Sequence, residues 1–152
     1  MKAIQFAATG GPDVLRLVDV APPAPQPGEI LVRHTAIGLN FIDTYHRTGL
    51  YPLPLPSGLG LEAAGVVEAA GAGVALHPGT RIGYCWGPIG AYATHRVIAA
   101  DRVVVLPDAV CERIIAIKGT IPEPPPIIHA TPGFIAKSQT AAAAPASAGR
   151  GT

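Results

Sequence analysis

The chain has 152 residues, of which 49% are hydrophobic and 14% charged, with a formal net charge of +1. This composition excludes a chain that is disordered throughout, and the near-neutral charge gives no reason to expect nucleic acid or an acidic membrane surface as a partner. Eighteen glycines and 17 prolines predict many turns and short strands rather than long helices. The length predicts a single domain.

Short β-type runs follow one another through the first 110 residues, separated by turn signals. A Pro-rich connector occupies 21–28, one or two helical turns are expected over 40–48, and 51–59 is expected to be an extended loop interrupted by prolines. Strands are expected over 1–7, 15–19, 29–39, 62–70, after the turn at 77–83, over 90–99 and over 102–106. This order predicts a mainly β fold, a partly open barrel with short helices.

The segment 62–70 (EAAGVVEAA) is rich in Ala and Glu and on that count resembles a helix. Gly65, the Val66-Val67 pair and the Gly-Ala-Gly turn at 71–73 favour a strand instead.

The patterning changes after residue 110. A proline-rich run at 121–126 blocks regular structure, and 140–152 is low-complexity Ala, Gly and Ser. We therefore divide the chain into a folded domain over 1–110 and a divergent, irregular tail over 111–152, expected to be disordered over most of 121–152.

The two cysteines, Cys85 and Cys111, are too few for the disulfide framework of a small secreted domain, and we interpret both as reduced, half-buried thiols. The N-terminal residues lack an apolar run followed by a cleavage site, and no stretch of about 18 apolar residues is free of Pro, Gly and charge. We expect no signal peptide, no membrane partner and a cytoplasmic location.

Three motifs carry a resemblance to a known family. They are AIGLNFIDTYHRTGLYP over 36–52, LPSGLGLEAAGVVEAAGAGV over 55–74, and HPGTRIGYC followed by GAYATHRVI between 77 and 98. In this order and spacing they resemble the GroES-like N-terminal domain of the medium-chain dehydrogenase/reductase superfamily, and most closely its zinc-independent NADPH:quinone oxidoreductase (zeta-crystallin-like) branch. The resemblance covers 1–110 and implies a GroES-like barrel that takes part in hydride transfer from NADPH to a quinone.

The resemblance implies that Asn40 and Tyr45 line the nicotinamide and substrate end of a cleft, and these are the predicted catalytic residues. A side-chain amide can hydrogen-bond a quinone oxygen or the nicotinamide amide, and a phenol can donate to the oxygen that gains charge as hydride arrives. Asn40, Tyr45 and Gly60 are also the expected cofactor contacts, forming a partial site. The expected substrate contacts are Phe41, Arg47, Tyr51 and Glu62.

Each of these residues also has a structural interpretation. Asn40 is equally suited to cap a helix, Tyr45 to a half-buried core position, and Glu62 to a hydrogen bond near the cleft. Arg47 is more typical of a solvated or ion-paired side chain, and His46 is expected to lie at the surface.

Zinc is not expected. Zinc-dependent relatives have a Gly-His-Glu motif where this chain has Gly60-Leu61-Glu62, and a leucine cannot bind metal. A structural zinc lobe needs four closely spaced cysteines, which this sequence lacks.

A nucleotide-binding domain is not expected within this sequence. A dinucleotide site needs a strand, a Gly-rich turn and a helix in succession. The sequence of 58–63 fits G-x-G-x-x-A, but a Pro-rich loop precedes it and a strand is expected after it. Our hypothesis is that the reading frame diverges near Val110, leaving a truncated chain that is inactive alone.

Three alternatives stay open at this stage. One is a cofactor-free module that binds a small apolar ligand or a partner chain, and another is a non-functional fragment. Among enzymes, the alternative is a zinc-independent enoyl reductase. The oligomeric state is open.

Overall fold

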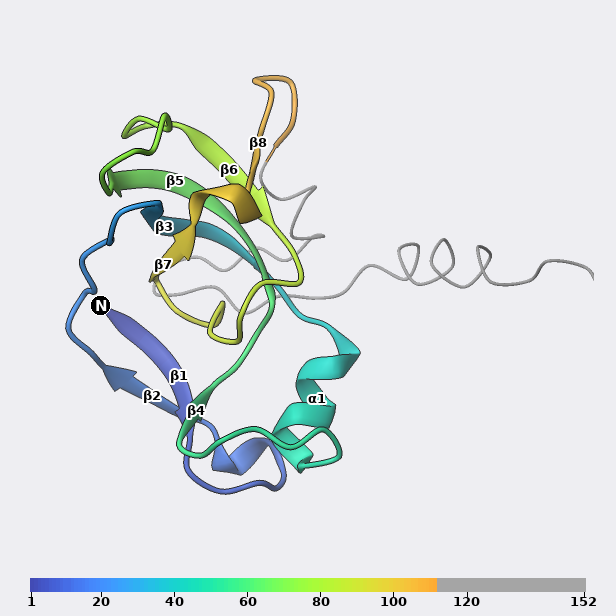
Figure 1. Ribbon diagram of the computed structural model, residues 1–152. Helices are drawn as coiled ribbons and strands as arrows, with labels where there is room; N and C mark the ends of the chain where they lie inside the picture. The colour runs from blue at the N-terminus through green and yellow to red at the C-terminus, as the bar shows by residue number, and fades with distance from the viewer. Residues whose placement is uncertain (112–152) are drawn as a thin grey trace, which may run out of the picture.

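The computed structural model describes residues 1–111. Within them lie eight strands, one α-helix and two 3-10 turns, at Pro12–Val14 and Ala100–Arg102. In chain order the main elements are β1 (Lys2–Phe6), β2 (Arg16–Asp19), β3 (Glu29–Gly38), α1 (Phe41–Thr48), β4 (Ser57–Gly58), β5 (Glu62–Ala70), β6 (Arg81–Tyr84), β7 (His95–Ala99) and β8 (Val104–Val105). The prediction of a mainly β, partly open barrel is confirmed (Figure 1).

Two antiparallel sheets make up the barrel. The larger has the order β7-β3-β5-β6-β8, and the smaller has the order β2-β1-β4. The segment before β7 joins them, because Ile4 N–H donates to the Tyr92 carbonyl oxygen over 2.8 Å and Ala3 forms a bridge with Ala93. Helix α1 follows β3 and lies at one end of the barrel (Figure 1).

The core lies between the sheets and draws on both. Alternate residues of β3 point inward, so Ile30 and Val32 are fully buried, as expected for a strand with period two. The buried cluster comprises Phe6, Ile30, Val32, Ile37, Leu59, Ala63, Val67, Ile82, Tyr84, Ala91, Tyr92 and Ile98.

The predicted strands agree with the structure most closely in the centre of the larger sheet. The strand predicted over 62–70 coincides with β5, and that over 29–39 differs from β3 by one residue. The strand predicted over 90–99 begins only at His95, because Gly90 adopts a left-handed conformation (φ +128°) and residues 91–94 run toward the smaller sheet. The strand predicted over 102–106 is reduced to the two residues of β8.

The prediction of half-buried cysteines is wrong, because Cys85 and Cys111 are both exposed. Cys85 follows the end of β6 and stands at the start of an exposed turn. The rest of the predicted tail, 112–152, lies outside the described residues. Within 1–111, α1 is far too short to cross a membrane, and no other helix has the length or apolarity to do so.

Candidate functional site

The site begins where the chain leaves β3 and turns into α1. Asn40 has extended backbone (φ −121°, ψ 152°) and is the residue that caps the helix. Its N–H donates to Asp43 Oδ2 over 2.8 Å, and the Asp43 N–H donates back to the Asn40 carbonyl oxygen over 3.0 Å. At the other end, Gly49 ends the helix in a left-handed conformation (φ +86°). Both ends of α1 are therefore fixed, and so is Asn40.

The side chain of Asn40 is held from the neighbouring strand. Its Nδ2 donates to Glu62 Oε2 over 3.1 Å, which places a candidate catalytic amide and a candidate substrate contact in direct contact. Gly38 pairs with Glu62 across β3 and β5, and a Cβ at Gly38 would lie only 2.6 Å from the Glu62 carboxyl carbon. The glycine therefore makes room for this carboxyl group. Burial raises the pKa of Glu62, and the hydrogen bond from Asn40 partly offsets that effect.

A second carboxyl group lies beneath the helix. Asp43 is 1% exposed, and its Oδ2 accepts a hydrogen bond from the Tyr92 hydroxyl over 2.9 Å. Burial raises the pKa of Asp43, while the hydrogen bonds from Asn40 and Tyr92 oppose that rise. Burial, and then the charge of Asp43, raises the pKa of Tyr92. These groups tie α1 to the segment that joins the two sheets.

Gly60 positions Tyr92 from the other side. It has a left-handed backbone (φ +88°), and a Cβ there would overlap the Tyr92 ring. Gly58, two residues earlier, belongs to β4 and pairs with Gln5 of β1. The G-x-G segment is thus engaged in strand pairing and ring packing and leads into a strand, which does not fit a phosphate-binding loop.

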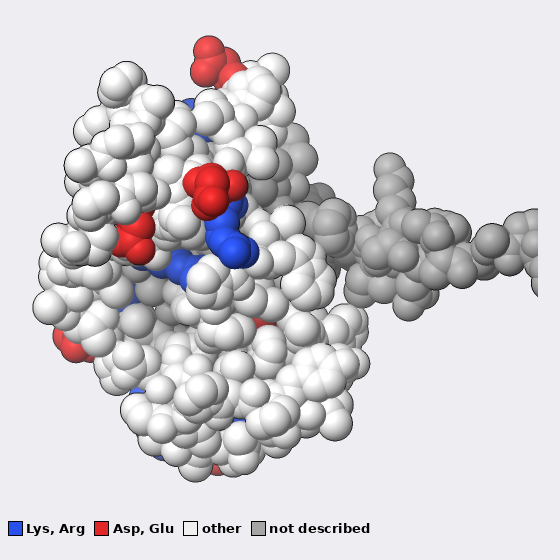
Figure 2. All heavy atoms as spheres, viewed as in Figure 1, with Lys and Arg blue, Asp and Glu red and all other residues white. Residues whose placement is uncertain are grey.

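Three aromatic side chains of the predicted site are exposed. Phe41 is 66%, Tyr45 38% and Tyr51 49% exposed. The Tyr45 and Tyr51 rings meet edge to face with centroids 5.5 Å apart, and the Tyr51 N–H donates to the Tyr45 carbonyl oxygen over 3.1 Å. Figure 2 shows few charged side chains over the lower part of the view, where α1 and β4 lie. The rings can therefore offer flat apolar surface to a ligand.

Arg47 makes its hydrogen bonds with Gly10. Its Nη1 donates to the Gly10 carbonyl oxygen over 2.8 Å, and the Gly10 N–H donates to the Arg47 carbonyl oxygen over 3.0 Å. This pair of bonds holds the 9–12 turn against the helix. The guanidinium group thus has a structural partner, and its role as a substrate contact stays a prediction.

The prediction that His46 lies at the surface is wrong. His46 is only 8% exposed. It lies three residues after Asp43, so both residues are on the inward face of α1. Asp43, His46 and Tyr92 were all missed as site residues. The pattern Asn-x-x-Asp at 40–43 is a capping-box signal that predicts the role of Asp43. No local signal indicates Tyr92, which lies 49 positions further along the chain.

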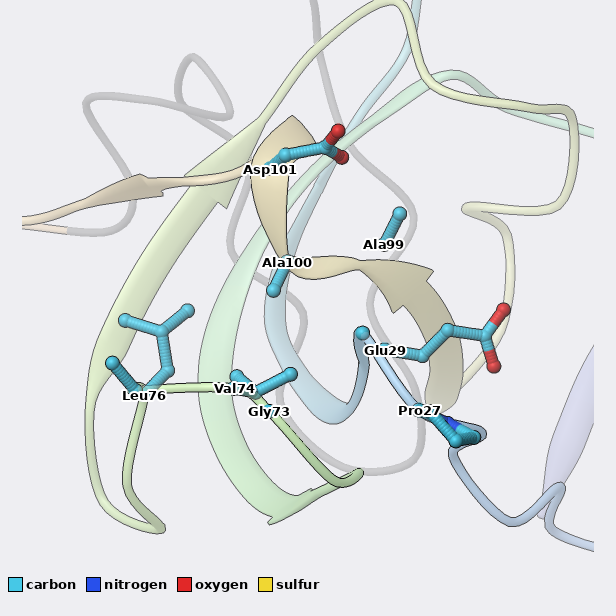
Figure 3. A pocket seen from close by; sticks show the side chains of 10 residues that line it. Pro27, Glu29, Gly73, Val74, Leu76, Ala99, Ala100 and Asp101 are labelled. Carbon is cyan, nitrogen blue, oxygen red and sulfur yellow. The ribbon is translucent and has the colours of Figure 1, made fainter.

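A hollow of about 690 Å³ lies at the opposite end of β3 from Asn40. Figure 3 shows it between the start of β3, the 73–76 loop and the end of β7, with Glu29 and Asp101 carrying the carboxylates. None of the predicted site residues lines it.

The described residues hold no group of three or more His, Cys, Asp or Glu side chains placed to bind a metal ion. Leu61, which the resemblance sets at the position of a zinc-binding histidine, is half-buried.

The fold is shared with a known protein family. Residues 26–108 match the alcohol dehydrogenase GroES-like domain family, and the chain belongs to that family. Its relatives include quinone oxidoreductases: the one from Pseudomonas aeruginosa is 56% identical over 111 residues, covering 72% of this chain and 34% of the relative.

Two further relatives bear on the function. The crystal structure of Escherichia coli quinone oxidoreductase complexed with NADPH superposes with a TM-score of 0.74 and 47% identity, covering 76% of this chain and 36% of that one. A 2-haloacrylate reductase from a Burkholderia species is 43% identical over 104 residues, covering 64% of this chain and 31% of the relative. The chain thus spans about a third of the length of these relatives.

Proposed function

We propose that residues 1–110 form the substrate-side domain for NADPH-dependent reduction of a quinone, without zinc. The observation that carries this proposal is the Asn40–Glu62 hydrogen bond, which orients a side-chain amide at the start of α1, the helix that also carries the exposed Tyr45 ring. The similarity to quinone oxidoreductases, one of them solved with NADPH, supports it.

NADPH, when bound, supplies the hydride. The residues of this chain orient the acceptor and stabilise the charge that develops on it. Because Asn40 Nδ2 donates one of its two hydrogens to Glu62, the second N–H stays available to the carbonyl oxygen of the nicotinamide amide or to a quinone oxygen. The Tyr45 hydroxyl donates to the oxygen that gains charge. Phe41 and Tyr51 offer apolar surface to the quinone ring, and Arg47 lies two residues after Tyr45 on α1. Gly60 makes room for the Tyr92 ring and so supports the wall of the cleft.

We infer that residues 1–111 supply one side of a cofactor site. Strand, Gly-rich turn and helix do not occur in succession within 1–111, so the phosphates of NADPH have no cradle there. We therefore propose that these residues do not catalyse the reaction without a nucleotide-binding domain.

A chimera tests the proposal. Residues 1–110 replace the matching segment of the Pseudomonas aeruginosa quinone oxidoreductase, and NADPH oxidation by 1,4-benzoquinone is followed by absorbance. The chimera is expected to be active, and Tyr45→Phe and Asn40→Ala are each expected to lower kcat/KM by about 10²-fold, the scale for loss of one donor at a developing charge. Purified 1–152 alone is expected to show only the uncatalysed rate.

Leu17→Ala in the same chimera is the matched control, because Leu17 is an exposed side chain of β2 and belongs to none of these contacts. A folded chimera that binds NADPH yet shows no quinone reduction would contradict the proposal. Equal rates for the parent and for both site variants would contradict the assigned residues.

A second acceptor class has one observation in its favour, the similarity to 2-haloacrylate reductase. Activated alkenes, like quinones, accept hydride at carbon and gain charge on a conjugated oxygen. The same chimera, assayed with 2-chloroacrylate and with an enone in place of benzoquinone, decides between the two classes by their kcat/KM ratio.

A further inference from the structure

Two buried atoms on the inward face of α1 have no hydrogen-bond partner among residues 1–111. They are Asp43 Oδ1 and His46 Nδ1. Both residues are more than nine-tenths buried, and they stand three positions apart, so the two atoms lie on the same side of the helix. Native structures leave few buried polar atoms unsatisfied, and two neighbouring ones indicate a shared partner.

The two side chains are not free to turn toward one another. Asp43 Oδ2 already accepts hydrogen bonds from the Asn40 N–H (2.8 Å) and the Tyr92 hydroxyl (2.9 Å), so rotating the carboxyl group would break both. The His46 ring packs edge-on against Tyr51, with centroids 6.2 Å apart. A third body between the two atoms would satisfy both and leave these contacts intact.

The chemistry of the two atoms identifies that body. A carboxylate oxygen accepts a hydrogen bond, and so does Nδ1 of a neutral imidazole that carries its hydrogen on Nε2. The partner needs two donor hydrogens and must be small enough for a buried position. We propose that one buried water molecule lies between Asp43 Oδ1 and His46 Nδ1 and donates one hydrogen to each.

The water extends an existing network. Asp43 already connects the backbone of Asn40 with Tyr92, and the water adds His46 to the same carboxyl group. His46 and the water thereby help to position Asn40 without contacting a substrate. This inference rests on the contacts of α1 and does not depend on the proposed reaction.

Nuclear magnetic resonance of the isotope-labelled full chain tests the proposal at pH 7.5. Long-range 1H–15N correlations report which ring nitrogen of His46 carries the hydrogen, and water-selective cross-relaxation reports a long-lived water beside the amides of 43–47. The expected result is hydrogen on Nε2 together with a water contact. Hydrogen on Nδ1 without a water contact, or contacts from protons of residues 112–152 at this place, would overturn the proposal.

Two substitutions sharpen the test. His46→Asn keeps a polar atom near the position of Nδ1, and His46→Leu removes it. The water contact is expected to persist in His46→Asn and to vanish in His46→Leu, whose unfolding equilibrium constant should be about tenfold larger. A water contact that survives in His46→Leu would refute the site. His77→Leu, at an exposed position, is the control, and the measurements on the unsubstituted chain decide the matter if His46→Leu does not fold.

Discussion

His34 is held in one protonation state by its neighbours. One ring nitrogen, Nδ1, lies 2.7 Å from the Ala93 carbonyl oxygen, which can only accept, so Nδ1 carries the hydrogen. The other, Nε2, therefore accepts from the Tyr84 hydroxyl over 2.8 Å, and Arg96 Nη1 donates to that hydroxyl oxygen over 3.3 Å. Burial lowers the pKa of His34 to about 4, and burial raises the pKa of Tyr84 to about 12.

This state makes stability depend on pH. Because the native pKa of His34 lies near 4 and its ordinary value is 6.5, the unfolded chain takes up the proton first as the pH falls through this window. The contribution of His34 to the free energy of unfolding is present above pH 6.5 and falls by up to about 1.4 kcal/mol per pH unit below it. Urea unfolding at pH 7, 6 and 5 measures the slope.

The matched variants for that slope are His34→Gln and His77→Gln. The first removes the half-buried ring and is expected to flatten the dependence between pH 6 and 5, whereas the second removes an exposed ring and should leave it unchanged. If His34→Gln keeps the slope of the unsubstituted chain, another group causes it.

At the scale of elements, the pairing of β3 with β5 is irregular. The register shifts between Leu31 and Val32 and again between His34 and Ala36. Gly65 of β5 lies opposite His34, and a Cβ there would overlap the Arg33 carbonyl oxygen. The obstacle is backbone in the middle of a sheet, which cannot move aside as a flexible side chain would.

Gly65→Ala is therefore expected to reduce the free energy of unfolding by about 1–3 kcal/mol, the usual cost of overpacking. Gly87→Ala is the matched control, because a Cβ at that position would meet its nearest atoms at an ordinary 3.5–3.7 Å. Thermal and urea unfolding of both variants measure the difference. Equal stability of the two would show that the sheet has room at Gly65.

At the scale of the whole molecule, the exposed apolar side chains of the described residues include two groups whose members are near one another in the sequence. Phe41, Leu50, Tyr51 and Leu55 lie on α1 and the segment after it, and Val104 and Val105 form β8 at the edge of the larger sheet. Exposed apolar groups that are near one another promote association, whereas isolated ones are common on protein surfaces.

Leu50→Lys is expected to lower both the binding of a hydrophobic dye and the apparent mass at high concentration, with the free energy of unfolding unchanged within about 0.5 kcal/mol. Leu17→Lys is the control, since Leu17 is similarly exposed (53% against 64%) but lies on β2 among charged neighbours. Sedimentation velocity over a range of concentrations measures the association. A chain that is monomeric throughout, with unchanged dye binding in Leu50→Lys, would contradict this prediction.

Much of the fold was predictable because strand formation has a local cause. Alternation of Ile30 and Val32 with outward residues marks β3, and Gly65 with two valines distinguishes β5 from a helix. The prediction failed where the conformation of a segment depends on contacts with a segment far away in the sequence. Residues 91–94 look like part of a strand but run to β1, and residues 102–106 contribute only β8.

The sequence by itself determined the class of the fold, the position of the helix after β3 and, through its motifs, the candidate residues Asn40, Tyr45 and Glu62. Only the tertiary structure decided which residues form hydrogen bonds with the residues of the site. Asn40 meets Glu62 across 22 positions and Asp43 meets Tyr92 across 49, so closure of the barrel and not local spacing selects these partners. The burial of His46 has the same origin, because the face of a short helix that becomes the inside depends on the sheet that packs beneath it.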